Sequence, residues 1–541
     1  MKAHCLPFSQ IPHTTRLFAD FLAYSSNVQP FYPRSPYFAE WMKEEAGKIS
    51  YDDPRRQQVA RILQRQNESW GASAKTLSNL ERLRQGAAAV VTGQQVGLFG
   101  GPMFALYKAL TAVKLAEQAS AAGIDAVPVF WLATYDHDLA EVNHVALPAA
   151  DGTLQVLATS SHDVPGAPVS SVQLGPEIVP VVEQAVALLG ESEAAQFLME
   201  CYRPGEMLGS AFARLYARIF ADWGVIVLDA SDPELARISV PMYRAAVEHA
   251  ADLSQALLKQ GARLEAAGYH QQVKVTESSV LLFTTRNGAR VPIHRRDQVE
   301  EEFVVDGEPG AEKLSRAELI SQIEVHPEQF SPNVLLRPIV QDYLLPTLAY
   351  TGGAAEAAYF GQAAAVYKSL SGRVTPVVPR FSATIVEPKV QRLLEKHALS
   401  VTDVFAGPEE LRCEIASHSL PADLQAAFDA AKQSFDSNFA AVKDKLEKLD
   451  RTLVDAAETS RSKMQHQLEK LYAQAARAEA QKGELVTRHA AHLSQSLYPD
   501  KGLQERAIGG IYFLARYGKE FLRELYAFIH TDCHDHQILE L

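Results

Sequence analysis

Cysteine is scarce in this chain. Its 541 residues include four cysteines, Cys5, Cys201, Cys413 and Cys533, which lie far apart and form no CxxC pair. The sequence therefore encodes neither a disulfide framework nor a structural zinc ribbon, and we expect a protein of the reducing cytoplasm. Cys201 and Cys413 have no histidine close in sequence, which favours buried small apolar residues over nucleophiles.

Long apolar runs and an excess of basic charge are also missing. No stretch reaches the ~18 apolar residues that a membrane helix needs, and the N-terminus has no uninterrupted apolar segment of the signal-peptide type. The chain has 52 Lys plus Arg against 65 Asp plus Glu, a formal charge of −13. Because nucleic-acid binding is built from basic surface, this balance argues against a nucleic-acid partner, while a small local site for an anion stays compatible with it.

The composition that remains is that of a globular protein. Hydrophobic residues make up 47% of the chain and charged residues 22%, which is enough to bury a sizeable core. At the usual ~100–200 residues per domain, the length indicates about three to four structural units.

Apolar runs alternate with helical stretches, which predicts an α/β fold with a Rossmann-like parallel sheet covered on both faces. Strands are expected at residues 87–92, 126–134, 224–229, 333–340 and 375–378, and a long helix follows the first strand at residues 104–122. Two stretches interrupt the alternation, near residues 148–175 and 265–330, and the second contains the hairpin signal Arg286–Asn287–Gly288. We assign residues 1–390 to this core, with these two stretches as inserts.

The composition changes from about residue 424, where proline and glycine become rare. Apolar residues then follow the 3–4 spacing of a coiled-coil seam, which falters at Asp450–Arg451–Thr452. One continuous helix over residues 424–490 would be ~100 Å long, so we favour an antiparallel hairpin that turns there. Such a seam is typical of a scaffold or dimerisation arm. We therefore assign residues 391–420 to a linker, residues 421–492 to a coiled-coil arm and residues 493–541 to a helical segment that docks on the core.

A glycine-containing loop follows the first strand and precedes the long helix. Gly93, Gln94, Gln95 and Gly97 belong to this loop, whose glycines let the backbone approach a ligand closely. It matches neither the dinucleotide fingerprint nor the P-loop. A tight strand-to-helix turn is the alternative, but its position at the carboxyl end of a strand favours ligand binding.

A polar cluster follows the second strand. If a helix begins near Asp138, the side chains of His137, Glu141 and His144 share one face. Together with Asp136, such a set could supply a general base oriented by a carboxylate, or ligate a metal. The structural alternative is a capped helix start with surface histidines. We favour a catalytic site of Asp136, His137, Asp138 and His144, without a tightly bound metal, because catalysis by His and Asp needs no ion.

A third group contains Arg337, Asp342 and Glu356. Arg337 and Asp342 either form an ion pair with each other, or hold the carboxylate and ammonium of an amino acid.

A fourth group lies near the C-terminus. We expect a solvated tail there rather than a zinc site, because tetrahedral sites usually need a second well-spaced pair of ligands; the residues are His530, Cys533, His534 and His536.

Four long segments carry a resemblance to a known family. They are VTGQQVGLFGGPMFALYKALTAVKLA (91–116), PVFWLATYDHDLAEVNHV (128–145), AFARLYARIFADWGVIVLDASDPEL (211–235) and LQERAIGGIYFLARYG (503–518). In collinear order over the whole chain, they resemble the bacillithiol biosynthesis cysteine-adding enzymes, a family of cysteine ligases.

The resemblance implies a Rossmann-like core with connective inserts, similar to class I aminoacyl-tRNA synthetases, and an α-helical coiled-coil domain through which the family forms homodimers. The implied activity is addition of L-cysteine to glucosaminyl-malate, which forms the amide bond of bacillithiol in the last step of its synthesis. Amide formation from a free carboxylate is uphill in water, so activation by ATP, with Mg²⁺, is expected. The His-x-Gly-His and Lys-Met-Ser-Lys-Ser signatures of class I synthetases are absent. The GQQVG loop occupies the first position, and Arg380–Phe381–Ser382 lies at the place expected for the second.

Residue roles follow from combining both arguments. His137 is the candidate to take a proton from the attacking amine, with Asp136 or Asp138 orienting it. The glycine-containing loop is expected to cradle a ligand, and Arg337, Asp342 and Glu356 to contact cysteine or malate. Gln504–Glu505–Arg506 is expected to dock the chain's end on the core, or to form part of a nucleotide pocket. The alternative function is a non-catalytic, dimeric assembly protein that senses a nucleotide or metabolite.

Overall fold

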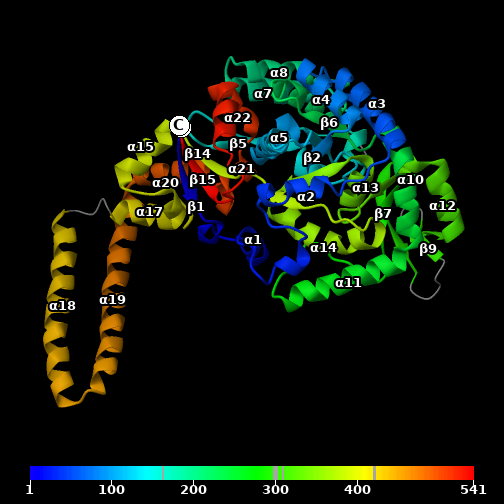
Figure 1. Ribbon diagram of the computed structural model, residues 1–541. Helices are drawn as coiled ribbons and strands as arrows, with labels where there is room; N and C mark the ends of the chain where they lie inside the picture. The colour runs from blue at the N-terminus through cyan, green and yellow to red at the C-terminus, as the bar shows by residue number, and fades with distance from the viewer. Residues whose placement is uncertain (161–163, 297–301, 307–309, 418–421) are drawn as a thin grey trace.

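The protein consists of a large body and a helical arm that projects from it (Figure 1). The computed structural model describes residues 1–160, 164–296, 302–306, 310–417 and 422–541. Among these residues, no helix is both long enough and apolar enough to cross a membrane.

A five-stranded parallel sheet forms the centre of the body. Its order is β13 (Val377–Pro379), β12 (Thr347–Gly352), β2 (Ala88–Gln94), β3 (Ala126–Leu132) and β6 (Ile226–Asp229). The chain therefore starts in the middle, builds outward through β3 and β6, and then returns to the other side of β2. This reversal between β2 and β12 is the switch point at which open α/β sheets bind ligands.

Both faces of the sheet are covered, as the apolar strands predict. On β3, Val129 and Trp131 belong to one hydrophobic core, and Phe130 and Leu132 to another. The first core contains helices α3 (Asp53–Ser69) and α14 (Ala354–Leu370), and the second contains α5 (Phe104–Ala121) and α9 (Leu208–Ile219). The Rossmann-like α/β prediction is confirmed.

One predicted strand is wrong. The apolar residues 333–340 form a turn and the start of helix α13 (Arg337–Leu344), and the strand follows later as β12. The Asn333 side chain accepts hydrogen bonds from the backbone N–H groups of Leu335 and Leu336, both at 3.0 Å, which initiates a helical turn. Pro338 then occupies the first turn of the helix. Backbone N–H groups there have no acceptor within the helix, so the missing N–H of proline costs no hydrogen bond.

The second insert forms a separate antiparallel sheet. Its order is β10 (Glu312–Ser315), β9 (Glu302–Val305), β8 (Ala289–Arg295), β7 (Ser279–Arg286) and β11 (Phe330–Pro332). The predicted hairpin is confirmed at Asn287–Gly288, which have φ values of +48° and +84°. The first insert, expected near residues 148–175, begins at the end of strand β4 (His144–Pro148) and contains its antiparallel partner β5 (Leu154–Ala158).

The two ends of the chain meet in a third sheet. Strand β15 (His536–Glu540) lies between β1 (Lys2–Leu6) and β14 (Ala383–Val386) (Figure 1). His536 is fully buried, and its ring nitrogens contact the hydroxyls of Ser382 at 2.7 Å and Thr384 at 2.9 Å. The prediction of a solvated tail is therefore wrong, because the partners of this segment lie far away in sequence.

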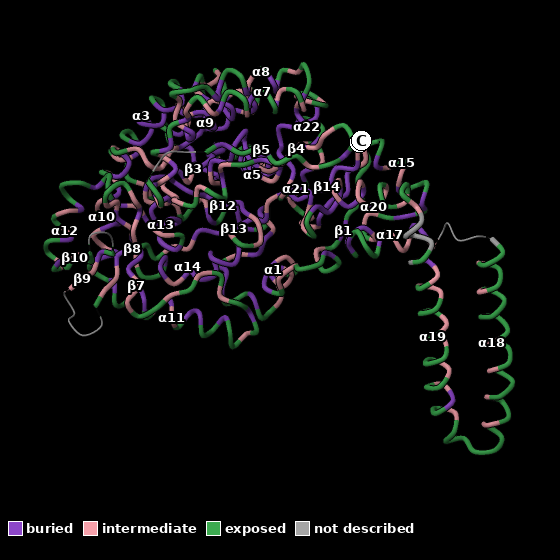
Figure 2. The backbone as a smooth tube through the Cα atoms, turned by 180° about the vertical axis from the view of Figure 1, so that it is seen from behind, coloured by how far each residue is buried: buried purple, intermediate pink, exposed green. Residues whose placement is uncertain are grey.

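A linker is expected at residues 391–420. Residues 388–417 form helices α15 (Pro388–His397), α16 (Val401–Val404) and α17 (Pro408–Ser417), and residues 418–420 lie outside the described residues. All three helices contact α20 (Glu484–Leu497) at the base of the arm. The arm is an antiparallel hairpin of α18 (Ala422–Leu449) and α19 (Leu453–Lys482), which confirms the predicted turn at residues 450–452. Residue 421, where the arm is expected to begin, lies outside the described residues. Figure 2 shows that little of the arm is buried.

Candidate functional site

A cavity of about 720 Å³ opens at the carboxyl edge of the central sheet. The residues after β2, the residues after β3 and the start of α14 after β12 contribute to its wall, so it lies at the reversal of strand order. The β7–β8 hairpin of the second insert closes one side. This is where the fold predicts a ligand site.

The cavity carries an excess of positive charge. Among the described residues, its walls contain six that are basic, Lys108, Lys274, Arg290, Arg337, Arg380 and Arg506, against three carboxylates, Asp136, Glu141 and Glu356. In a chain with a formal charge of −13, this concentration of cations indicates an anionic ligand.

The predicted loop lies in the cavity wall through Gly93, Gln94 and Gln95. A Cβ on Gly93 would meet the Trp131 carbonyl oxygen at 3.1 Å, so glycine permits this close packing. The Gln95 amide nitrogen donates to Asp136 Oδ2 at 2.7 Å and to Glu141 Oε2 at 2.8 Å. Gly97 does not line the cavity; there a Cβ would lie 2.8 Å from the Cα of Gly101, so this glycine lets the loop fold back on itself.

The polar cluster after β3 is divided by the fold. Asp136 and His137 line the cavity, whereas Asp138 and His144 do not and are exposed. The predicted shared helical face is wrong, because helix α6 (Leu139–Val142) has only four residues and His144 begins strand β4.

The partner of the His137 ring is an arginine. Arg290 Nη1 lies 3.3 Å from His137 Nδ1, while the nearest Asp136 oxygen lies 3.6 Å from the same nitrogen. A guanidinium only donates, so Nδ1 accepts and a neutral ring carries its proton on Nε2. Nε2 can accept a proton only in the other tautomer, in which Nδ1 carries the ring proton. Arg290 must therefore move away from Nδ1 before His137 can act as a base at Nε2. Arg290 itself stacks on Phe283, with its central carbon 3.8 Å from the ring centre.

Lys108, in the second turn of α5, is a site residue that the sequence prediction missed. Its ammonium donates to the Gly93 carbonyl at 2.8 Å and to Gln94 Oε1 at 2.7 Å, and it forms an ion pair with Glu356 Oε2 at 2.7 Å. Burial lowers the pKa of Lys108 to about 8, against the opposing effect of Glu356. The signal for it was a charged residue surrounded by buried apolar residues of the same helix.

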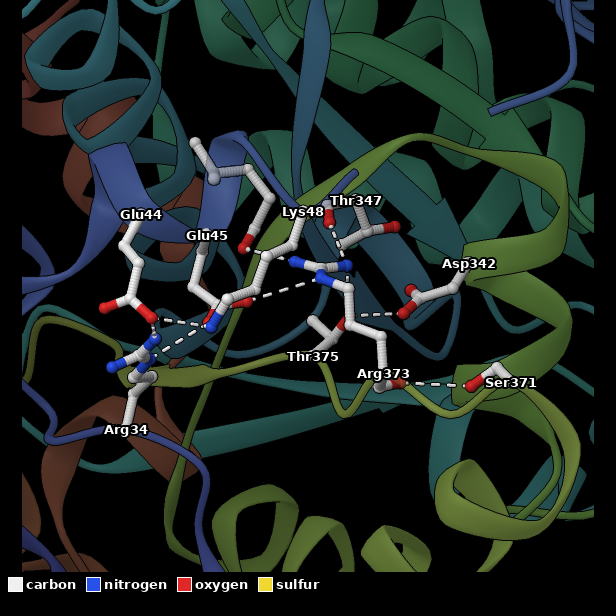
Figure 3. A network of polar contacts seen from close by, with 10 residues as sticks. Arg34, Glu44, Glu45, Lys48, Asp342, Thr347, Ser371, Arg373 and Thr375 are labelled. Carbon is white, nitrogen blue, oxygen red and sulfur yellow. Dashed lines mark hydrogen bonds and ion pairs between the residues drawn. The ribbon is translucent and has the colours of Figure 1, made fainter. Parts of the chain in front are cut away.

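Arg337 lies in the cavity wall and does not pair with Asp342. Its guanidinium donates to Gln341 Oε1 at 3.0 Å and to the Tyr359 hydroxyl at 2.8 Å. Asp342 lies outside the cavity wall, in a polar network with Thr375, which donates to its carboxylate, and Arg373 (Figure 3). Burial raises the pKa of Asp342. The ion pair of Arg337 with Asp342, one of the two alternatives, is therefore not formed. Asp342 lies behind the cavity wall, so the expectation that it contacts a ligand together with Arg337 is not met either.

The end of the chain contributes to the cavity. Glu505, on the short helix α21 (Gln504–Ala507), forms an ion pair with Arg380 at 2.5 Å, and both side chains are buried. Arg380 and Arg506 lie over the ring of Phe104, at 5.3 and 5.8 Å from its centre. The segment 504–506 therefore both docks on the core and lines the cavity.

A metal site is not evident in the described part of the chain, since it contains no group of three or more His, Cys, Asp or Glu side chains arranged to hold an ion.

Comparison with known proteins gives the family. Residues 1–381 match the model described as "Bacillithiol biosynthesis BshC, N-terminal Rossmann-like domain", and residues 383–541 match "Bacillithiol biosynthesis BshC, C-terminal coiled-coil domain". The chain belongs to the BshC family. Similar proteins come from Koribacter versatilis (47% identical over 541 residues, 100% of both chains), Solibacter usitatus (36% over 545 residues, 100% of both) and Salinibacter ruber (34% over 551 residues, 99% of this chain and 98% of the relative). Each is named "Putative cysteine ligase BshC".

Both matched regions of this BshC-family chain contribute to the cavity. Arg380 lies at the end of the Rossmann-like region, and Arg506 lies within the coiled-coil region. The cavity is therefore complete only when the C-terminal segment is docked on the core.

Proposed function

We propose that the protein is a ligase that adds L-cysteine to glucosaminyl-malate by forming an amide bond, the last step of bacillithiol synthesis. Membership of the BshC family supports the assignment. The observation that carries it is the cationic cavity at the sheet's switch point. The acceptor in this reaction brings the two carboxylates of malate, which complement that excess of positive charge.

The reaction needs two chemical functions from the cavity. The acceptor amine must lose a proton as it attacks the carbonyl carbon, and His137 is the residue proposed to take it. The cysteine carboxylate must first be activated, and ATP with Mg²⁺ is the proposed source. The N-terminus of α14, together with Arg380 and Arg506, offers the N–H groups and charge that suit phosphates.

A purified assay with cysteine and glucosaminyl-malate, with and without ATP and magnesium, tests the reaction and its energy source. We expect a thiol product with the mass of the amide, formed only with ATP. Product formed equally well without ATP would contradict the proposed activation.

A strain that lacks the protein distinguishes the ligase from the alternative assembly protein. A ligase predicts loss of bacillithiol and accumulation of glucosaminyl-malate, both measured by thiol and metabolite mass spectrometry. Normal bacillithiol without such accumulation would reject the ligase and favour the sensing or assembly role.

A further inference from the structure

Two polar groups in the cavity wall have no hydrogen-bond partner. The indole nitrogen of Trp131 and the hydroxyl of Tyr135 are both buried and unpaired among the described residues. Trp131 is only 1% exposed. The two groups lie near one another, without good hydrogen-bond geometry between them. Buried donors left unpaired are costly, so their position in a cavity wall indicates that a ligand completes them.

A buried cation in the same wall also lacks a counter-charge. Arg337 is 7% exposed, and its two hydrogen-bond acceptors, Gln341 and Tyr359, are neutral. No carboxylate of the described residues lies within 4.0 Å of its guanidinium, and the nearby Glu356 forms its ion pair with Lys108. A buried charge without a partner is strongly unfavourable, so an anion from outside the chain would stabilise this arrangement.

We propose that Arg337, Trp131 and Tyr135 form a binding site for one carboxylate group of the acceptor substrate. Arg337 uses two of its five N–H donors within the protein, which leaves three for a ligand. The indole N–H and the tyrosine O–H add two donors. A carboxylate, with about four lone-pair sites on two oxygens, accepts from all three residues at once.

The bound carboxylate is one that does not react. A buried guanidinium stabilises the carboxylate anion and withdraws its electron density, which opposes its attack on ATP. The cysteine carboxylate must make that attack, so it belongs elsewhere in the cavity. A carboxylate of the malate end has no covalent role and fits the site. Naming malate rests on the proposed function, whereas the site for an anion rests on the geometry alone.

Malate binding to the full-length protein, measured by calorimetry without cysteine or ATP, tests the site. W131F removes the indole N–H while keeping an aromatic ring, and Y135F removes the hydroxyl alone. We expect each to raise the malate Kd by about tenfold, the usual effect of one lost hydrogen bond to a charged group. R337Q should abolish detectable binding. W223F, which alters a tryptophan outside the cavity wall, should leave the Kd unchanged.

Several outcomes would overturn the proposal. An unchanged malate Kd in W131F and Y135F would reject the site. These two variants do not change the charge of the protein, so they still test the site if R337Q fails to fold. Loss of malate binding in R506Q alone would place the carboxylate at the C-terminal segment. Sulfate that competes as well as malate would indicate an unselective anion site. Cysteine that binds with the same dependence on Trp131 and Tyr135 would assign the site to the amino acid. Because no turnover is measured, absence of ligase activity would not change any of these results.

Discussion

At the scale of single residues, the lysine in the cavity wall sets the direction of its neighbours' hydrogen bonds. The Lys108 ammonium has three N–H donors and contacts three acceptors, the Gly93 carbonyl, Gln94 Oε1 and Glu356 Oε2. Because lysine only donates, the Gln94 amide presents its oxygen to Lys108. The NH₂ group of Gln94 then points away from Lys108 and can donate to a ligand. Through its contacts to Gly93 and Gln94, Lys108 thus positions the predicted loop.

The titration of Lys108 gives the first prediction. Above its pKa of about 8 the neutral amine has two donors for three acceptors, so the loop loses one contact. We expect kcat/KM to fall as pH rises through 8, mainly through a higher KM. K108M should be about tenfold or more less active at pH 7 and should lack this pH dependence. A wild-type profile that stays flat between pH 7 and 9 would contradict the role.

The free energy of unfolding should rise with pH over the range in which kcat/KM falls. The pKa of Lys108 falls from its ordinary 10.5 to about 8 on folding, so between these values the unfolded chain binds more protons than the folded one. The free energy of unfolding of the wild type, relative to K108M, should therefore rise from pH 8 to 10.5. Urea unfolding at several pH values measures this difference.

His137 gives the second prediction. If it accepts the proton of the attacking amine, H137A should lower kcat by about 10²–10⁴-fold while the protein stays folded. R290Q should also change kcat although His137 is retained, because the ring nitrogen at 3.3 Å loses the guanidinium that donates to it. H326A changes an exposed histidine that does not line the cavity and serves as the control. Full activity of H137A would remove His137 from the mechanism.

The sequence predicts best the site residues at the end of a strand or directly after it. Gly93, Gln94, Gln95, Asp136 and His137 were found this way, because parallel strands end at one edge of the sheet. Arg506 belongs to the segment 504–506, for which part of a nucleotide pocket is one of the two sequence-based alternatives. The contributors that the sequence does not point to include Lys274 and Arg290 of the second insert. Nothing in their local sequence shows where tertiary packing places them.

At the scale of elements, the docking of helix α21 completes the site. Glu505 receives hydrogen bonds from Arg380, from the Ser382 hydroxyl at 3.0 Å and from the backbone N–H of Ala383 at 3.1 Å. Gln504 adds two bonds to the backbone of Ile385, both at 2.8 Å. This short helix thus joins β14 to the C-terminal segment.

Removing the Glu505 carboxylate is the third prediction. E505A leaves the Arg380 guanidinium, 8% exposed, without its buried partner, which should cost about 3–5 kcal/mol of unfolding free energy. Substrate binding should weaken too, since Arg380 and Arg506 both line the cavity. E520A, which removes an exposed ion pair with Arg523, should cost less than about 1 kcal/mol. Equal losses for the two variants, measured by urea unfolding, would contradict the structural role of Glu505.

Element prediction succeeded where the local pattern matched the tertiary environment. The strands at residues 87–92 and 126–134 and the hairpin turn were correct for this reason. The run at residues 333–340 was equally apolar, but a buried helix and a buried strand share that composition, and only the Asn333 turn and Pro338 distinguish them.

At the scale of the whole molecule, charge and surface are distributed unevenly. The cavity collects cations in a chain of charge −13, whereas the arm carries exposed apolar side chains. The sequence indicated the net charge and the arm, but the strand order and the meeting of the two termini depend on long-range contacts that no local pattern encodes.

The arm by itself leaves apolar surface uncovered. Val442, Leu449, Met464 and Leu471 are 50–78% exposed. The facing helices α18 and α19 also leave a gap of about 260 Å³ between them, lined in part by Phe428 and Tyr472. A helical hairpin with such a seam gains stability by packing against another helix pair, which supports the proposed homodimer.

Charge placed on this seam gives the fourth prediction. We expect the wild type to have twice the chain mass by light scattering. The double variant V442E/M464E in the full chain should be a monomer of 59.4 kDa, because two buried carboxylates per chain oppose association. K445E changes an exposed charge on the same helix and should remain dimeric. A dimer that persists in V442E/M464E would place the interface elsewhere. Since none of the arm residues that the structure describes lines the cavity wall, the monomer should retain kcat/KM. A loss of activity with intact folding would mean that the second copy supports the site.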